Sequence, residues 1–304
     1  MTSVSPASAP RSSEPPEVEG VSHRWVRARG LDFHVAEAGE GDDVVLCLHG
    51  WPQHWYEWRH LIPALADAGH RVLAMDLRGS GWSDAPRDGY EKENLADDVL
   101  AVLDELGVAR VSLVGHDWGG WIGFLLGMRA PQRLHRYLAL NILHPWVELR
   151  RMAPHIWRFG YQWILLSPVI GYQIHRSGRV IPKALVGGSS VKDVWDEETV
   201  HAFSDTFTRP DYARAGVQLY RTFNFKELPA IARGRYLEQR LTVPTLLLFG
   251  EGDTALPAGL LGGYEGHADD MRVELVPGCG HFIADECPAL VAERAIEFFA
   301  TPTA

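Results

Sequence analysis

The feature that most constrains this chain is a short apolar run that ends in a tight glycine turn. Residues 111–120 read VSLVGHDWGG, and a helix is predicted from Trp118. The pattern Gly-x-Nu-x-Gly between a strand and a helix is typical of a nucleophile elbow, in which the glycines permit a sharp turn that lifts the central side chain above a sheet. The central residue is Asp117, so the pattern predicts a carboxylate nucleophile. The alternative is that Asp117 only caps the helix, because anions are favoured at helix N-termini.

Apolar runs and helical patterns alternate on both sides of this turn, which indicates an α/β fold with a mostly parallel sheet of about eight strands, covered by helices on both faces. The segment 144–235 has no comparable strand pattern and is aromatic and helix-like. We therefore expect a core of residues 21–143 and 236–304, a helical cap at 144–235, and a disordered N-terminal tail at 1–20. The predicted strands are 23–28, 31–36, 43–48, 71–77, 110–114, 134–143, 243–249 and 271–276, and the predicted helices are 55–68, 94–106, one from 118, and 288–299.

Charge and hydropathy exclude two broad classes of function. The chain carries 29 Lys and Arg against 39 Asp and Glu, a formal net charge of −10, whereas a nucleic-acid binder needs a basic face. The uncharged run from Phe159 to Ile174 is interrupted by Pro168 and Gly171. It is shorter than the roughly 20 apolar residues that a membrane-spanning helix needs. We therefore expect neither nucleic acid nor a membrane as a partner.

Cysteine spacing gives a prediction about the redox environment. The three cysteines are Cys47, Cys279 and Cys287, and none lies in a CxxC pair. This spacing argues against a disulfide framework and against a structural zinc site. It favours a reducing, cytoplasmic location.

A carboxylate nucleophile at an elbow needs a histidine base and an acid that orients it, in the chain order nucleophile, acid, histidine. His281 stands at the end of a predicted strand in the glycine-rich PGCGH loop, and Asp253 stands at the tip of the loop after the run LLLFG. Glu251 and Asp285 are alternative acids. A carboxylate after the strand 134–143 is a further alternative, and Glu148 is the nearest one.

The loop after the strand 43–48 reads HGWP and faces the elbow in such a fold. The backbone N–H groups of Trp51 and Trp118 are therefore candidates for an oxyanion hole, and Pro52 could follow a cis peptide bond. His49 and His116 are expected to form scaffold hydrogen bonds instead of taking part in the chemistry.

Four motifs resemble those of α/β-hydrolase-fold epoxide hydrolases, in a branch that also includes haloalkane dehalogenases, and the resemblance covers about residues 22–300. The motifs are HGWPQHWYEWR (49–59), RGSGWS (78–83), GHDWGG (115–120) and GCGH (278–281). The resemblance implies an α/β-hydrolase fold and an apolar epoxide and water as the partners. It implies no metal or organic cofactor, and leaves open whether the chain is a monomer or a homodimer.

The resemblance also implies a two-step reaction and two further residues. A carboxylate that attacks an alkyl carbon gives an ester, whereas its attack on a substrate ester would give a high-energy anhydride, so an aspartate argues against an ordinary esterase. Water activated by His281 would then hydrolyse the ester, with Asp253 stabilising the imidazolium. Two tyrosines of the cap donate protons to the opening epoxide in the family, and Tyr161 and Tyr220 match them by position. Tyr172 repeats the Tyr-Gln dipeptide of Tyr161 and is an alternative.

Two other functions remain as alternatives. Haloalkane dehalogenases usually have Asn in the loop after HG, where this chain has Trp51, and fluoroacetate dehalogenases have Arg after the nucleophile, where this chain has Trp118. Both differences favour the epoxide hypothesis over hydrolysis of a carbon–halogen bond. A non-catalytic ligand-binding protein is the third hypothesis, and the set of Asp117, Asp253 and His281 argues against it.

Overall fold

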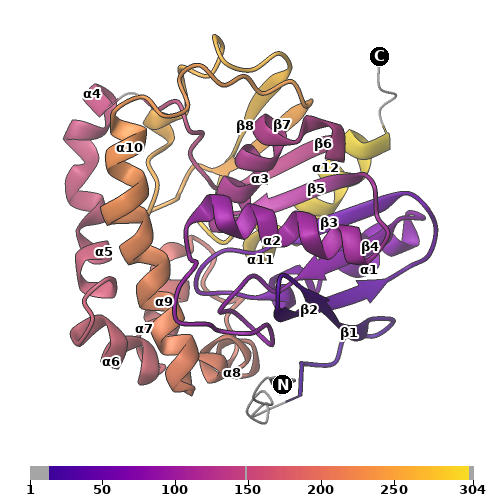
Figure 1. The fold of residues 1–304 in the computed structure, drawn as a ribbon, viewed down its shortest axis with the longest axis horizontal. Helices are drawn as coiled ribbons and strands as arrows, with labels where there is room; N and C mark the ends of the chain where they lie inside the picture. The colour runs from indigo at the N-terminus through magenta and orange to yellow at the C-terminus, as the bar shows by residue number, and fades with distance from the viewer. Residues whose placement is uncertain (1–13, 148, 301–304) are drawn as a thin grey trace, which may run out of the picture.

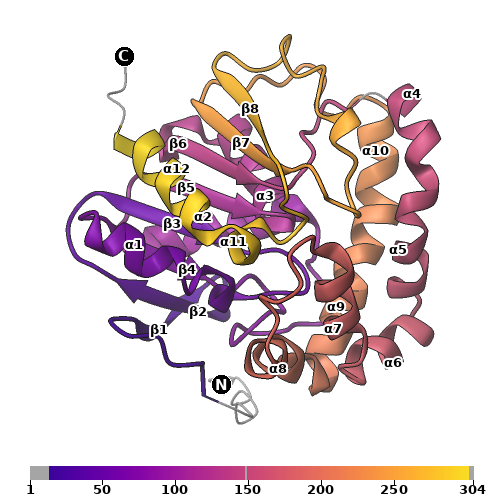
Figure 2. The same ribbon diagram turned by 180° about the vertical axis from the view of Figure 1, so that it is seen from behind.

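The computed structural model describes residues 14–147 and 149–300 (Figures 1 and 2). Its centre is an eight-stranded sheet with the order β1-β2-β4-β3-β5-β6-β7-β8. β1 pairs with β2, and β2 with β4, in antiparallel fashion, whereas all the other pairs are parallel. The strands are β1 (Ser22–Ala28), β2 (Leu31–Ala38), β3 (Val44–Leu48), β4 (Arg71–Met75), β5 (Val111–His116), β6 (Leu134–Leu140), β7 (Thr245–Gly250) and β8 (Met271–Val276). The predicted α/β class and the mostly parallel sheet are confirmed.

Helices cover both faces of the sheet because its central strands are apolar on both sides. All residues of β3, β5 and β7 are buried. In Figure 1, α2 (Lys92–Glu105) and α3 (Trp118–Arg129) lie over one face, and in Figure 2, α1 (Leu61–Asp67), α11 (Ile283–Glu286) and α12 (Pro288–Ala300) lie over the other. Leu95 and Phe124 belong to the core cluster under the first layer, and Leu65 and Val291 to the cluster under the second.

The chain between β6 and β7 is helical throughout its regular parts, and we call Leu149–Ala232 the helical insertion. Its helices lie together beside the sheet in both views (Figures 1 and 2). They are α4 (Leu149–Met152), a 3₁₀ segment (Ala153–Phe159), α5 (Gly160–Leu165), α6 (Ile170–Arg176), α7 (Val180–Gly188), α8 (Glu197–Asp205), a 3₁₀ turn (Thr206–Thr208), α9 (Pro210–Thr222), a π-helical turn (Phe223–Glu227) and α10 (Leu228–Ala232).

The structure differs from the predicted elements in some strand ends, in the first helix and in the tail. The predicted strands 71–77 and 134–143 end earlier, at Met75 and Leu140. The predicted helix 55–68 is divided into a 3₁₀ turn (Trp55–Trp58) and α1. The predicted tail is only partly described: residues 1–13 lie outside the described residues, whereas Val18 packs against the second core cluster. Of residues 14–147 and 149–300, none forms a helix of the length and hydropathy that a bilayer crossing requires.

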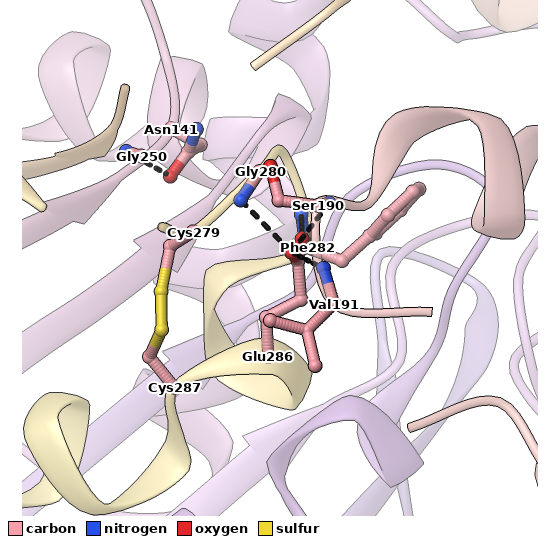
Figure 3. The surroundings of a disulfide bond; sticks show 9 residues. All are labelled: Asn141, Ser190, Val191, Gly250, Cys279, Gly280, Phe282, Glu286 and Cys287. Atoms are coloured by element: carbon pink, nitrogen blue, oxygen red, sulfur yellow. Dashed lines mark hydrogen bonds between the residues drawn. A yellow bond between two sulfur atoms is a disulfide. The ribbon is translucent and has the colours of Figure 1, made fainter. Parts of the chain in front are cut away.

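The prediction that argues against a disulfide is wrong. Cys279 and Cys287 are joined by a disulfide, and their Cα atoms lie 6.5 Å apart. The chain between them passes through His281 and α11, and it returns so that Cys287 lies beside Cys279 (Figure 3). Because this return depends on the local fold and not on a spacing motif, a search for CxxC pairs misses it. Cysteine usage therefore gives no argument for a reducing compartment.

Candidate active site

The turn between β5 and α3 has the backbone that an elbow requires. Asp117 has φ 47° and ψ −118°, a conformation that costs a non-glycine residue about 1–3 kcal/mol. A Cβ on Gly119 would collide with the carbonyl of Leu48, and a Cβ on Gly115 would lie 2.6 Å from the carbonyl oxygen of Gly119. Only glycine therefore lets the turn close this tightly against β3. Among the described residues, the Asp117 side chain caps no N–H of α3, so the alternative of a helix-capping aspartate is not supported.

The Asp117 carboxylate contacts the first predicted oxyanion-hole residue. The backbone N–H of Trp51 donates to Oδ2 of Asp117 over 2.8 Å. The Trp51–Pro52 peptide bond is cis. Trp118 is the first residue of α3, so its backbone N–H belongs to the unpaired first turn of that helix. The two predicted donors thus come from the loop after β3 and from the first residue of α3, next to Asp117.

His281 and Asp253 form a buried pair. Nδ1 of His281 lies 2.8 Å from Oδ2 of Asp253. An ionised carboxylate only accepts hydrogen bonds, so Nδ1 carries a proton, and in the neutral imidazole Nε2 is left with a lone pair. Burial disfavours the imidazolium, but the Asp253 charge outweighs it, so the pKa of His281 is raised above its ordinary 6.5. Burial likewise opposes ionisation of Asp253, yet His281 and several hydrogen bonds keep the pKa of that carboxyl lowered.

Asp253 is fixed by groups other than His281. Its Oδ1 accepts the N–H groups of Ala255 (2.7 Å) and Leu256 (2.8 Å). Asn141, at the end of β6, donates from Nδ2 to Oδ2 of Asp253 over 2.8 Å and accepts the N–H of Gly250 over 3.1 Å. The strand that was a candidate to supply an alternative acid therefore supplies an amide that holds the acid.

The two described alternative acids, Glu251 and Asp285, make no hydrogen bond to His281 like that of Asp253. Glu251 is exposed. Asp285 is buried and engaged elsewhere, by Arg59 at 2.6 Å and by Gln53 at 2.7 Å. Glu148 lies outside the described residues. The geometry therefore selects Asp253 as the partner of His281.

A cavity of about 330 Å³ lies between the helical insertion and the strand ends. Apolar side chains form much of its wall, among them Leu165 and Val180. Five of the predicted residues also line it: Trp51, Asp117, Tyr161, Tyr220 and His281. Asp253 and Trp118 do not line the cavity but contact residues that do. Asp253 contacts His281, and the ring centroids of Trp118 and Tyr220 lie 5.8 Å apart.

The two predicted tyrosines lie next to each other in the wall of this cavity, although they come from different helices. Tyr161 of α5 and Tyr220 of α9 meet edge to face, with ring centroids 6.4 Å apart. Tyr220 is buried, whereas 37% of Tyr161 is exposed. The loss of hydration in the cavity, partial for Tyr161, raises the pKa of both phenols above 10, and the Asp117 charge adds to this effect. Both hydroxyls therefore stay protonated at neutral pH and can donate.

Tyr172, the alternative to Tyr161, lies elsewhere. Its hydroxyl accepts a hydrogen bond from Arg176 of the same helix, over 3.3 Å in an exposed region. It is not among the residues that line the cavity. Of the two Tyr-Gln dipeptides, the fold brings the first toward Asp117.

His49 and His116, which are expected to make scaffold hydrogen bonds, are both engaged by neighbouring groups. His49 accepts the N–H of Leu77 at Nε2 over 3.0 Å, and its Nδ1 lies 2.9 Å from the carbonyl of Gly50. His116 lies 2.6 Å from Glu57 through Nδ1 and 2.9 Å from the carbonyl oxygen of His281 through Nε2. Burial disfavours its charged form, but Glu57 dominates and raises the pKa of His116 to about 9.

Sequence reasoning missed a buried ion pair behind the site. Lys92, at the start of α2, lies 3.3 Å from Glu227 in the π-helical turn, and its ammonium also donates to the carbonyl of Leu219 over 2.8 Å. The same ammonium lies 4.4 Å from the ring centroid of Trp118. Lys92 and Glu227 are 135 positions apart, and nothing local marks either residue as buried. The pair joins Trp118 to the end of α9, where Tyr220 lies.

No group of three or more His, Cys, Asp or Glu side chains within the described ranges is arranged to hold a metal ion.

Comparisons with known proteins agree with this architecture. Residues 43–288 match the family described as alpha/beta hydrolase fold. The chain is 30% identical over 288 residues to the soluble epoxide hydrolase of Corynebacterium sp. (strain C12), covering 92% of this chain and 98% of that protein. It is 29% identical over 295 residues to the AB hydrolase superfamily protein YfhM of Bacillus subtilis (strain 168), covering 92% and 99%.

A solved structure shows the same fold. The epoxide hydrolase VrEH1 from Vigna radiata superimposes with a TM-score of 0.81 at 27% identity, covering 93% of this chain and 98% of that one. With the elbow, the eight-stranded sheet and the helical insertion, these matches show that the chain belongs to the α/β hydrolase family, within the group that contains the epoxide hydrolases.

Proposed function

We propose that this chain hydrolyses an epoxide to a vicinal diol through an alkyl–enzyme ester on Asp117. The observation that carries the proposal is that an elbow carboxylate and two protonated phenols line one cavity. A carboxylate displaces oxygen from an alkyl carbon, and the phenols lie where a departing alkoxide would need a proton. The residues 144–235 would act as a cap over this cavity.

In the first step, Oδ1 of Asp117 attacks a ring carbon, because Oδ2 is already engaged by the N–H of Trp51. A new carbon–oxygen bond forms as the ring carbon–oxygen bond breaks. The ring oxygen leaves as an alkoxide and takes a proton from Tyr161 or Tyr220, while the other hydroxyl stabilises the developing charge. The first step ends with a hydroxyalkyl ester of Asp117.

In the second step, Nε2 of His281 removes a proton from water, and the hydroxide attacks the ester carbonyl. Asp253 stabilises the imidazolium that forms. The oxyanion of the tetrahedral intermediate is held by the backbone N–H groups of Trp51 and Trp118. Collapse of the intermediate expels the second alkoxide, which takes the proton from the His281 imidazolium and leaves as the diol. The Asp117 carboxyl group then loses its proton, which passes to the tyrosinate formed in the first step, so that the carboxylate and the phenol are both restored.

One incubation separates this reaction from carbon–halogen hydrolysis. The enzyme is mixed with styrene oxide and 1-bromobutane, and diol and bromide are followed together, with Asp117→Ala as the control. Diol without bromide, absent from the control, supports the proposal. Bromide without diol would assign the chain to dehalogenation. If neither product forms, a wider panel of epoxides is tested, and the absence of diol from that panel too would favour a ligand-binding protein.

A further inference from the structure

A single carboxylate next to the disulfide accepts hydrogen bonds from both sides of His281. Oε1 of Glu286 accepts the N–H of Phe282 over 3.1 Å, and its Oε2 accepts the N–H of Gly280 over 2.9 Å. Gly280 and Phe282 are the two neighbours of His281 in the chain. Figure 3 shows Glu286 at the centre of this loop, with the Cys279–Cys287 disulfide beside it.

The same carboxylate also reaches the helical insertion. Oε2 of Glu286 accepts the N–H groups of Ser190 (2.7 Å) and Val191 (2.9 Å), which follow α7 (Figure 3). Four backbone N–H groups from two distant segments thus converge on one side chain, which is only 7% exposed. Such hydrogen bonds to an ionised acceptor are about twice as strong as those between neutral groups.

We propose that Glu286 is a positioning residue that holds His281 in place for hydrolysis of the ester. The backbone N–H of His281 donates to the carbonyl of Gly188 over 2.9 Å, and its carbonyl lies 2.9 Å from Nε2 of His116. Glu286 fixes the N–H groups on both sides. All three N–H groups from residue 280 to 282 and the carbonyl of His281 are therefore engaged, and this backbone sets the direction of the imidazole.

The loop that contains His281 packs closely against the helical insertion. A Cβ on Gly280 would lie 2.6 Å from the N–H nitrogen of Ser190 and 2.9 Å from Oε1 of Glu286. The loop and the insertion therefore approach each other through bare backbone, and the carboxylate fills the space between them. A side chain that accepts at both of its terminal atoms is needed, which a carboxylate provides and an amide does not.

The inference rests on the proposed two-step reaction, and it predicts an effect on one step only. Ring opening uses Asp117 and the tyrosines, whereas ester hydrolysis uses His281. Displacing His281 should therefore slow hydrolysis and leave ring opening intact. A residue that only stabilises the fold would lower the amount of active enzyme or slow both steps together.

Glu286→Gln tests this assignment, because the amide keeps the size of the side chain but turns an N–H₂ group toward one of the donors. Single turnovers with styrene oxide are quenched at intervals, and the ester on Asp117 is measured by mass spectrometry, with each sample normalised to its folded, active fraction. Glu274→Gln is the matched control, because Glu274 of β8 pairs with Arg294 at the surface. Glu286→Asp keeps the charge and serves as the conservative variant if the amide fails to fold.

In Glu286→Gln we expect ester hydrolysis to slow roughly ten- to hundredfold while ring opening stays within about twofold. Glu286→Asp should show a smaller loss in the same step, and Glu274→Gln none. Equal slowing of both steps in the Glu286 variants, or a smaller active fraction with unchanged rates, would overturn the assignment. His281→Gln distinguishes a failure of the reaction itself: if this variant accumulates no ester, the proposed function falls, and the role of Glu286 falls with it.

Discussion

Oδ2 of Asp253 lies 2.8 Å from Nδ1 of His281, so the acid and the base meet although they are 28 positions apart. The same oxygen accepts the Asn141 amide over 2.8 Å. The negative charge is thus held in one place, directly behind the imidazole. This arrangement orients Nε2 and, in the proposed reaction, sets the pH range in which Nε2 acts as a base.

The raised pKa of His281 determines the direction of the pH dependence. The imidazolium cannot accept a proton from water, so ester hydrolysis should be slow below this pKa and should rise through a midpoint above 6.5. Asp253→Asn removes the charge that raises the pKa, so the midpoint should move to lower pH and the maximal rate should fall. Single-turnover hydrolysis measured from acid to alkaline pH checks both effects. A midpoint that stays in place in Asp253→Asn would contradict the pairing.

Replacing either cavity tyrosine by phenylalanine should slow ring opening. Loss of one proton donor should cost about a hundredfold or less, because the second phenol remains, and the double variant should be nearly inactive. Pre-steady-state formation of the ester measures this step directly. Tyr172→Phe is the matched control and should match the parent enzyme, because the Tyr172 hydroxyl is engaged by Arg176. Slow ring opening in Tyr172→Phe together with normal rates in Tyr161→Phe would reverse the assignment.

The disulfide should contribute to stability. Cys279 and Cys287 close a short loop, for which the chain-entropy model gives about 2–3 kcal/mol. Dithiothreitol should therefore lower the free energy of unfolding of the oxidised protein by about that amount, as measured by urea denaturation. Cys287→Ser should show the lower stability from the start and no response to the reductant. Equal stability of the parent protein with and without reductant would contradict this prediction.

The Lys92–Glu227 pair should show strong coupling. Both side chains are buried, so Lys92→Met leaves the Glu227 carboxylate in the interior without its counter-charge and should cost about 3–5 kcal/mol. The double variant Lys92→Met with Glu227→Leu should recover much of that loss. Urea denaturation of the two single variants and the double variant gives the coupling energy. Additive losses would show that the two charges do not depend on each other.

Much of the fold could be predicted because its signals are local. The apolar runs of β3, β5 and β7 are buried over their whole lengths, so they stand out without any knowledge of the neighbouring strands. The position of Asp117 was equally visible, because Gly115 and Gly119 mark the turn around it.

The supporting residues could not be predicted because their roles depend on distant partners. Glu286 meets Ser190 across 96 positions, and its own neighbourhood reads as an ordinary helix start. The disulfide depends on α11 turning the chain back. Tyr161 and Tyr172 share a Tyr-Gln dipeptide but lie on different helices, and α5 is the one that places its tyrosine at the cavity. These distinctions come from packing between elements, which no single segment encodes.

The most direct measurement is a single turnover in heavy-oxygen water, with enzyme in excess over styrene oxide. If Asp117 forms the ester, the oxygen added to the first diol comes from its carboxylate, so this diol should be unlabelled and the peptide containing Asp117 should gain one heavy oxygen. A labelled first diol with an unlabelled Asp117 peptide would mean that water attacks the epoxide directly, and it would contradict the covalent mechanism.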